Sequence, residues 1–236
     1  MIAIGNVELG MVPRIAVPLT DGDIAQRAAA ALQWADIVEL RVDLFRSHAA
    51  ADVTAACRTV RQLGAPVLVT VRSPDQGGGG DLSDQRRLAL YEAALPFADA
   101  CDIELQSPLR EAVLALADQH GVTTIVSHHD FAATPDDDAL AAMLRDAAAS
   151  GAHIAKIAAT ANSSSDRNRL LDLLREHRDQ NLIVIAMGPH GAASRVFFPL
   201  CGSLITYGYF GESVAPGQLS IQELRSELSR YCPDLS

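Results

Sequence analysis

The chain has 236 residues, of which 49% are hydrophobic and 20% charged, and its formal net charge is −10 at pH 7. This length suits one large domain, and the apolar fraction excludes an intrinsically disordered chain. An acidic chain without clusters of Lys and Arg is poorly matched to a phosphate backbone, so the composition argues against a nucleic-acid partner.

Membrane insertion and secretion are not expected either. No stretch of the sequence reaches the roughly 20 apolar residues that cross a bilayer. The N-terminal segment carries Asn6 and Glu8 where a signal peptide would have an unbroken apolar core. We therefore expect a cytoplasmic protein without membrane contact.

Eight short apolar runs recur along the chain. They occupy residues 14–19, 36–42, 66–72, 101–105, 123–129, 153–158, 182–187 and 203–209. Their hydrophobicity is continuous rather than alternating, which is typical of parallel strands that are buried on both faces.

Segments rich in Ala, Leu, Arg and Glu separate these runs, for example residues 84–98 and 165–180. Ser83, Asp136 and Ser165–Asp166 are candidate caps at the starts of such helices. Eight strand–helix units predict a (β/α)8 TIM barrel that spans residues 1–236 as a single domain.

The first residues precede the predicted barrel. A turn at Gly5–Asn6 predicts a short N-terminal β-hairpin that closes the bottom of the barrel.

Charged residues interrupt three of the predicted strands. Glu39, Arg41 and Asp43 alternate along the second strand, which places them on one face. Arg72 ends the third strand, and Asp102 and Glu104 alternate in the fourth.

Side chains that face outward from a parallel sheet would lie beneath helices, so we expect these charges to point into the barrel. There they form an ion-paired layer that suits a polyhydroxylated, anionic small molecule.

Lys156 lies in the middle of the sixth apolar run, between small and apolar neighbours. A buried ammonium must be paired or must lose its proton, because desolvation disfavours the charged form. A neutral lysine amine can attack a carbonyl and form a Schiff base. The pattern leaves both interpretations open: a reactive amine, or a lysine neutralised by a barrel carboxylate.

His129 ends the fifth predicted strand, next to His128. Successive strand residues face opposite sides, so only one of the two points inward. Imidazole moves protons well near neutral pH, although a satisfied core histidine would show the same pattern. We expect no metal site, because Asp130 and both histidines cannot converge from one short strand.

Two polar residues follow the last strands. Arg195 comes after the seventh strand, and a guanidinium is a natural bidentate partner of a carboxylate. Gln218 ends the turn 215–218 on the rim after the eighth strand.

Several short motifs coincide with the eight predicted strands. They are ELRVD at 39–43, TVRS at 70–73, DIEL at 102–105, SHHDF at 127–131, AKIA at 155–158, MG at 187–188, SR at 194–195 and APGQ at 215–218. In their order and spacing they resemble the type I 3-dehydroquinate dehydratases, the Schiff-base enzymes of the shikimate pathway.

The resemblance implies a homodimeric barrel that needs no metal or cofactor and acts on 3-dehydroquinate. Lys156 matches the lysine that forms an imine with the C3 ketone, and His129 matches the general acid and base. Arg195 matches the group that holds the substrate carboxylate.

The other matched residues have supporting roles in the family's pattern. Glu39, Arg41 and Arg72 match groups that bind the ring hydroxyls, Gln218 matches a rim contact, and Met187 matches a pocket wall. We also expect Asp102, Glu104 and Ser213 at pocket or supporting positions.

The sequence departs from the family's pattern at two positions. Gln76 stands where a glutamate usually orients the histidine, and we expect its amide to accept a hydrogen bond from His129. Val214 stands where a serine usually precedes the Ala-Pro-Gly-Gln turn, with Ser213 just upstream.

Two other functions compete with this interpretation. A class I Schiff-base aldolase would also use Lys156, but those acting on sugar phosphates usually carry a glycine-rich phosphate site after strands seven and eight. A catalytically impaired barrel that binds a small acid is the second alternative.

Overall fold

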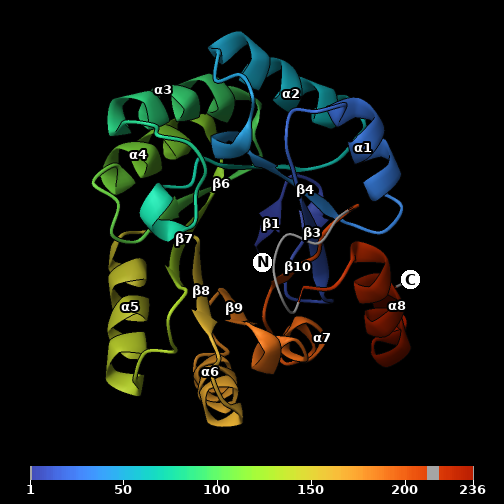
Figure 1. Ribbon diagram of the computed structural model, residues 1–236, viewed down its shortest axis with the longest axis vertical. Coiled ribbons are helices and arrows are strands. Elements are labelled where there is room, and N and C mark those ends of the chain that lie inside the picture. The colour runs from blue at the N-terminus through green and yellow to red at the C-terminus, as the bar shows by residue number, and fades with distance from the viewer. Residues whose placement is uncertain (1, 212–217, 236) are drawn as a thin grey trace.

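The barrel wall is one eight-stranded parallel sheet (Figure 1). The computed structural model describes residues 2–211 and 218–235. In these residues the sheet comprises β3 (Arg14–Leu19), β4 (Ile37–Arg41), β5 (Val67–Thr70), β6 (Ala100–Glu104), β7 (Thr123–Asp130), β8 (Ile154–Thr160), β9 (Leu182–Met187) and β10 (Ile205–Tyr207). The predicted (β/α)8 barrel is confirmed.

The two edges of the sheet meet. Strands pair in the order β10-β3-β4-β5-β6-β7-β8-β9. The backbone N–H of Leu204, just before β10, donates to the carbonyl of Leu182 in β9 across 2.9 Å. The barrel is therefore nearly closed, which leaves little exposed strand edge.

An α-helix follows each strand and covers the outside of the wall (Figure 1). The helices of the described residues are α1 (Ile24–Ala31), α2 (Ala50–Gln62), α3 (Asp84–Ala94), α4 (Arg110–His120), α5 (Asp137–Ala149), α6 (Ser164–Glu176), α7 (Ser194–Leu200) and α8 (Ile221–Tyr231). Within this described set, every helix is too short or too polar to cross a membrane.

Polar side chains cap three of the helices near the expected places. The side chains of Ser83 and Asp136 accept backbone N–H groups at the starts of α3 and α5, as predicted. The cap of α6 is Ser163 instead of the expected Ser165–Asp166. The Ser163 hydroxyl accepts the backbone N–H of Asp166 at 3.2 Å, so the helix begins earlier.

Residues of each strand alternate between two cores. Val38 and Leu40 of β4 pack under the helices, whereas Ile37 points to the barrel axis. The inner apolar layer contains Ile37, Leu68, Ala100, Ile125, Ile154, Ile183 and Ile205. Two residues further along five of these strands lie Glu39, Thr70, Asp102, Ser127 and Lys156. The barrel is therefore apolar at its base and polar toward the carboxyl ends of its strands.

The N-terminal hairpin fills the base, as predicted. β1 (Ala3–Ile4) and β2 (Val7–Glu8) pair antiparallel, and Gly5 adopts a left-handed φ of 55° in the tight turn between them. Ile4 and Leu9 are buried against the inner apolar layer. The hairpin thus closes one end of the barrel.

The alternation on β4 stops earlier than expected. The strand ends at Arg41, and Asp43 lies in the 3₁₀ turn Val42–Leu44 that follows. Asp43 accepts two hydrogen bonds from Arg41, from Nε at 3.0 Å and from Nη2 at 2.8 Å. The prediction that Asp43 continues the strand is therefore wrong, because Asp43 lies in the turn and binds Arg41 through both carboxylate oxygens.

A buried ion pair joins α3 to the barrel wall. Arg87 is 2% exposed, and its Nη2 donates to Glu104 of β6 at 2.6 Å. Its Nε and Nη2 also donate to the carbonyl of Val71, just after β5, at 3.1 and 2.9 Å. One guanidinium therefore links a helix to the ends of two strands.

We expect Arg87→Met to lower the free energy of unfolding by about 3 to 5 kcal/mol, because it removes the charged hydrogen bond to Oε2 of the buried Glu104 carboxylate and leaves only the contacts of Oε1 with Ser73 and Arg72. Urea denaturation measures the change. Arg175→Met is the matched control, because that side chain is 69% exposed. The control should change stability by no more than about 0.5 kcal/mol, and equal effects of the two variants would contradict the prediction.

Candidate active site

Lys156 lies at the centre of the polar end of the barrel. Its side chain is buried, and Nζ donates to Asp102 Oδ2 at 2.9 Å. Nζ also lies 4.3 Å from the centroid of the Tyr207 ring. Of the two interpretations that the sequence left open, the structure shows the amine paired with a carboxylate. The amine must therefore give up a proton before it can attack a carbonyl.

Asp102 connects this amine to two neighbouring strands. Its Oδ1 lies 2.8 Å from Nη2 of Arg72 and accepts a hydrogen bond from the Ser127 hydroxyl at 2.6 Å. Burial would raise the pKa of Asp102, but the positive charges of Arg72 and Lys156 outweigh it and hold the pKa well below its usual range. Asp102 is therefore a permanent negative charge beside the lysine.

His129 is half-buried, and its Nδ1 atom lies out of contact with solvent. Burial, with the positive charges of Arg72 and Lys156, holds the pKa of His129 well below its ordinary value. Its Nδ1 has no hydrogen-bond partner among the described residues. The half-buried His128 also has a lowered pKa, because of burial. The imidazole of His129 is thus neutral at pH 7 and able to accept a proton.

Gln76 contacts His129 differently from the expectation. Its Oε1 accepts the backbone N–H of His129 at 2.8 Å, whereas the expected partner was the imidazole. The 3₁₀ turn Pro74–Gln76 places the amide beside the end of β7, within reach of the main chain. Gln76 therefore holds the strand end that carries the histidine.

Arg195 is a buried cation on the first turn of α7. The residue is 6% exposed, and within the described residues its guanidinium forms no ion pair and its Nε has no hydrogen-bond partner. Burial lowers the pKa of Arg195 to about 10, so the group remains charged at neutral pH. Gln218 Oε1 is likewise buried without a partner among those residues. A buried, unpaired guanidinium is suited to receive an anion.

The other predicted polar residues already have partners in the wall. Glu39 accepts a hydrogen bond from the Thr70 hydroxyl at 2.8 Å. Arg72 donates to Ser127 at 2.6 Å as well as pairing with Asp102. These contacts confirm that the charges of the strands face inward.

The remaining predicted residues lie around this group. Glu104 accepts the backbone N–H of Ser73 at 2.7 Å in addition to binding Arg87. Met187 ends β9 and packs against the inner apolar layer. Ser213 lies outside the described residues.

Two aromatic residues of the site were not predicted from the sequence. Tyr91 on α3 donates from its hydroxyl to the carbonyl of Asp102 at 2.6 Å and accepts the backbone N–H of Val71 at 3.2 Å. Tyr207 reaches the lysine from β10. Strand alternation could have identified Tyr207, because it is two residues beyond the inward-facing Ile205. The helix pattern of α3 gave no comparable signal for Tyr91.

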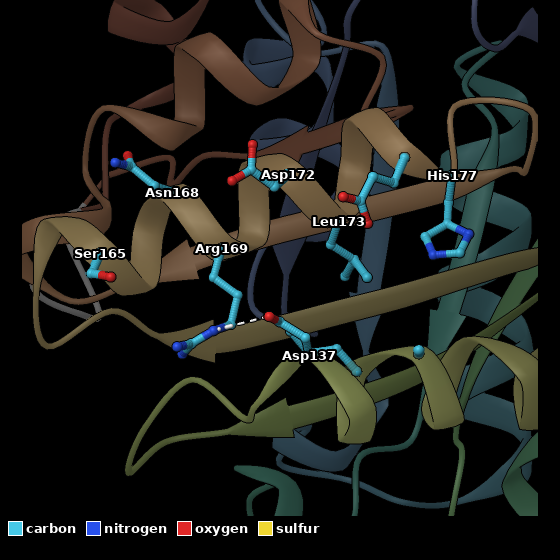
Figure 2. Close-up of a pocket in the computed structure, with 10 residues that line it drawn as sticks. Asp137, Ser165, Asn168, Arg169, Asp172, Leu173 and His177 are labelled. Atoms are coloured by element: carbon cyan, nitrogen blue, oxygen red, sulfur yellow. Dashed lines mark ion pairs between the residues drawn. The ribbon is translucent and has the colours of Figure 1, made fainter.

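A groove lies on the outside of the barrel between α5 and α6, and its charged pair is partly exposed, unlike the buried charges inside the barrel (Figure 2). Arg169 and Asp137 face each other there at 3.1 Å, and the Asp137 side chain is 86% exposed. Among residues 2–211 and 218–235, no group of three or more His, Cys, Asp or Glu is arranged to hold a metal ion. We therefore assign the active site to the polar end of the barrel.

The fold and this site define a barrel enzyme with a buried lysine, an adjacent permanent carboxylate and a neutral histidine. Residues 15–231 match the family described as Type I 3-dehydroquinase. The chain belongs to the type I 3-dehydroquinase family, whose members are hydro-lyases.

Individual relatives agree with the family match. A 3-dehydroquinate dehydratase of Methanococcoides burtonii is 34% identical over 233 residues, which cover 97% of this chain and 98% of the relative. The crystal structure of the 3-dehydroquinate dehydratase of Aquifex aeolicus has a TM-score of 0.86 and 34% identity, covering 93% of this chain and 99% of that one.

A third structure is similar over almost the whole chain. The type I 3-dehydroquinate dehydratase of Clostridium difficile, described with covalently modified comenic acid, has a TM-score of 0.91 and 28% identity, covering 99% of this chain and 98% of that one.

We expect Gln76→Glu to raise the pKa of His129 by about 1, because a carboxylate near a histidine favours the imidazolium. NMR titration of the ring protons measures it. Asp75→Asn, an exposed neighbour in the same turn, is the control and should leave the titration unchanged. An unaltered His129 titration in Gln76→Glu would contradict the prediction.

Proposed function

We propose that this chain dehydrates 3-dehydroquinate to 3-dehydroshikimate in the shikimate pathway, through an imine on Lys156 and with His129 as general base and acid. Membership of the family and the relatives named above support the reaction. The observation that carries the assignment of residues is the buried Lys156 ammonium close to a histidine, His129, whose pKa is held well below its ordinary value by burial and by the charges of Arg72 and Lys156. The covalently modified ligand described for the Clostridium difficile enzyme is consistent with a covalent route.

Imine formation begins with the loss of a proton from the Lys156 ammonium. In this proposal His129 accepts the proton, because the charges of Arg72 and Lys156 hold the pKa of Asp102 well below its usual range and keep that carboxylate ionised. The free amine attacks the C3 carbonyl carbon and forms a C–N bond. The carbonyl oxygen takes one proton from the attacking nitrogen, which gives a neutral carbinolamine, and a second from protonated His129. It then leaves as water, and the nitrogen becomes positively charged as an iminium.

Elimination follows on the covalent intermediate. His129 removes a proton from C2, and the electron pair moves to the iminium nitrogen to give an enamine. The enamine returns its electron pair as the C1 hydroxyl leaves, and protonated His129 supplies the proton that makes it water. Water then hydrolyses the product imine and restores Lys156. The positive nitrogen beside the forming carbanion lowers the barrier by electrostatic stabilisation.

The substrate carboxylate has a natural partner in Arg195. That guanidinium is buried and charged, and among the described residues it lacks a counter-ion. A carboxylate would satisfy it with two parallel hydrogen bonds. Gln218 offers an acceptor nearby on the rim, and Glu39, Arg41 and Arg72 face the remaining ring hydroxyls in this proposal.

Reductive trapping tests the assignment of Lys156. Incubation with 3-dehydroquinate and borohydride should add a stable mass to the wild-type chain, which peptide mass spectrometry locates at Lys156. Lys156→Ala should give no adduct and no absorbance from 3-dehydroshikimate, because the covalent route needs the amine. An adduct only with a ketose phosphate would favour the aldolase, and no adduct with any carbonyl would favour a binding protein.

Steady-state kinetics test Arg195. We expect Arg195→Met to raise KM about 10- to 100-fold, since a charged hydrogen-bond partner of the substrate is lost, with a smaller change in kcat. Arg195→Lys keeps the positive charge but lacks the planar guanidinium, so its KM should lie between those of the wild type and Arg195→Met. A normal KM in Arg195→Met would contradict the anchoring role.

The homodimer and the cytoplasmic location that the resemblance implies stay predictions that rest on that resemblance. The same holds for the expectation that the reaction needs no metal or cofactor.

A further inference from the structure

Tyr207 brings an aromatic ring into the charged layer. It is the last residue of β10, it is 8% exposed, and it belongs to the inner cluster of the barrel. The Nζ atom of Lys156 lies over its ring, 4.3 Å from the centroid. The face of an aromatic ring carries partial negative charge and attracts a cation at this distance.

The Tyr207 hydroxyl is buried and has no hydrogen-bond partner among the described residues. Burial, with the negative charges of Glu39 and Asp102, raises the pKa of Tyr207 well above its ordinary value. The hydroxyl is therefore a protonated donor. Buried polar groups are almost always satisfied, so a donor beside the reactive lysine that the described residues leave without an acceptor indicates that its acceptor arrives with the ligand.

We propose that Tyr207 is a further catalytic residue, whose ring face stabilises the positive charge on the Lys156 nitrogen in the iminium and whose hydroxyl donates to an oxygen of the bound substrate. The inference rests on the proposed imine at Lys156. It adds a second source of stabilisation at the nitrogen that already pairs with Asp102.

The charge on the nitrogen changes during the reaction, which is why the ring matters. The carbinolamine that precedes the loss of water is neutral at nitrogen, whereas the iminium that follows is positive. A ring that attracts the cation favours the iminium in this step without exchanging a proton. The concentration of iminium is thus the quantity that Tyr207 controls.

A graded series at position 207 tests the ring. Tyr207→Phe keeps the aromatic ring face. Phenylalanines with one, two and three fluorine atoms at this position keep about the same ring size but progressively weaken the partial negative charge on the ring face. The readout is the initial rate of reductive trapping at Lys156 with cyanoborohydride under saturating 3-dehydroquinate. The rate should fall stepwise from Phe, by about five- to thirtyfold at three fluorines; a flat series overturns the role of the ring.

The kinetics of Tyr207→Phe test the hydroxyl. KM should rise about three- to tenfold, the effect of losing one hydrogen bond to the substrate, while kcat changes less. Tyr231→Phe removes a hydroxyl from a tyrosine that is 54% exposed and is the matched control with unchanged KM. An unchanged KM in Tyr207→Phe overturns the contact with the substrate.

The wild-type chain separates this inference from the function on which it rests. If wild type forms no adduct at Lys156, the imine and the role of Tyr207 are both overturned. If wild type forms the adduct and the fluorinated series is flat, only the role of the ring is overturned.

Discussion

The buried pair between Lys156 and Asp102 is the interaction on which the site depends. An ammonium inside a barrel is tolerated only with a counter-charge, and that counter-charge needs hydrogen bonds of its own. Arg72 and Ser127 supply them to the carboxylate, and Tyr91 holds the backbone at the same residue. These partners come from strands β6, β7 and β8, from the end of β5 and from helix α3. The pairing register of the strands therefore determines where the Lys156 nitrogen lies.

His129 and Arg195, the other two ionisable groups of the site, differ in their charge at neutral pH. Positive charges on Arg72 and Lys156 reinforce burial and keep His129 neutral. Arg195 is buried as well, but its high intrinsic pKa leaves it charged. Among the described residues, the polar end of the barrel thus offers a neutral base and a cation without a counter-ion at once. This combination suits a substrate that carries both an acidic C–H bond and a carboxylate.

Much of this arrangement was predictable from periodicity. Inward-facing positions follow a period of two along each strand, so the burial of Glu39, Asp102 and Lys156 follows once the eight strands are recognised. The contact of Gln76 was not predictable in the same way. Whether an amide reaches the ring or the main chain of His129 depends on how the turn after β5 lies against β7, which no local pattern encodes.

Arg87 shows a related limit. It lies on α3 among residues that resemble an ordinary exposed helix surface, yet it is buried against the end of β6. Its role becomes visible only when the helix is placed on the wall.

The N-terminal hairpin leaves the barrel open at one end only. With Ile4 and Leu9 filling the base, everything that enters at the polar rim must also leave there. Two molecules of water are expelled in each proposed cycle, one by condensation and one by elimination, and one is drawn back for hydrolysis. These water molecules and the substrate pass through the same open end of the barrel. The covalent bond to Lys156 therefore keeps the substrate ring in place while water enters and leaves.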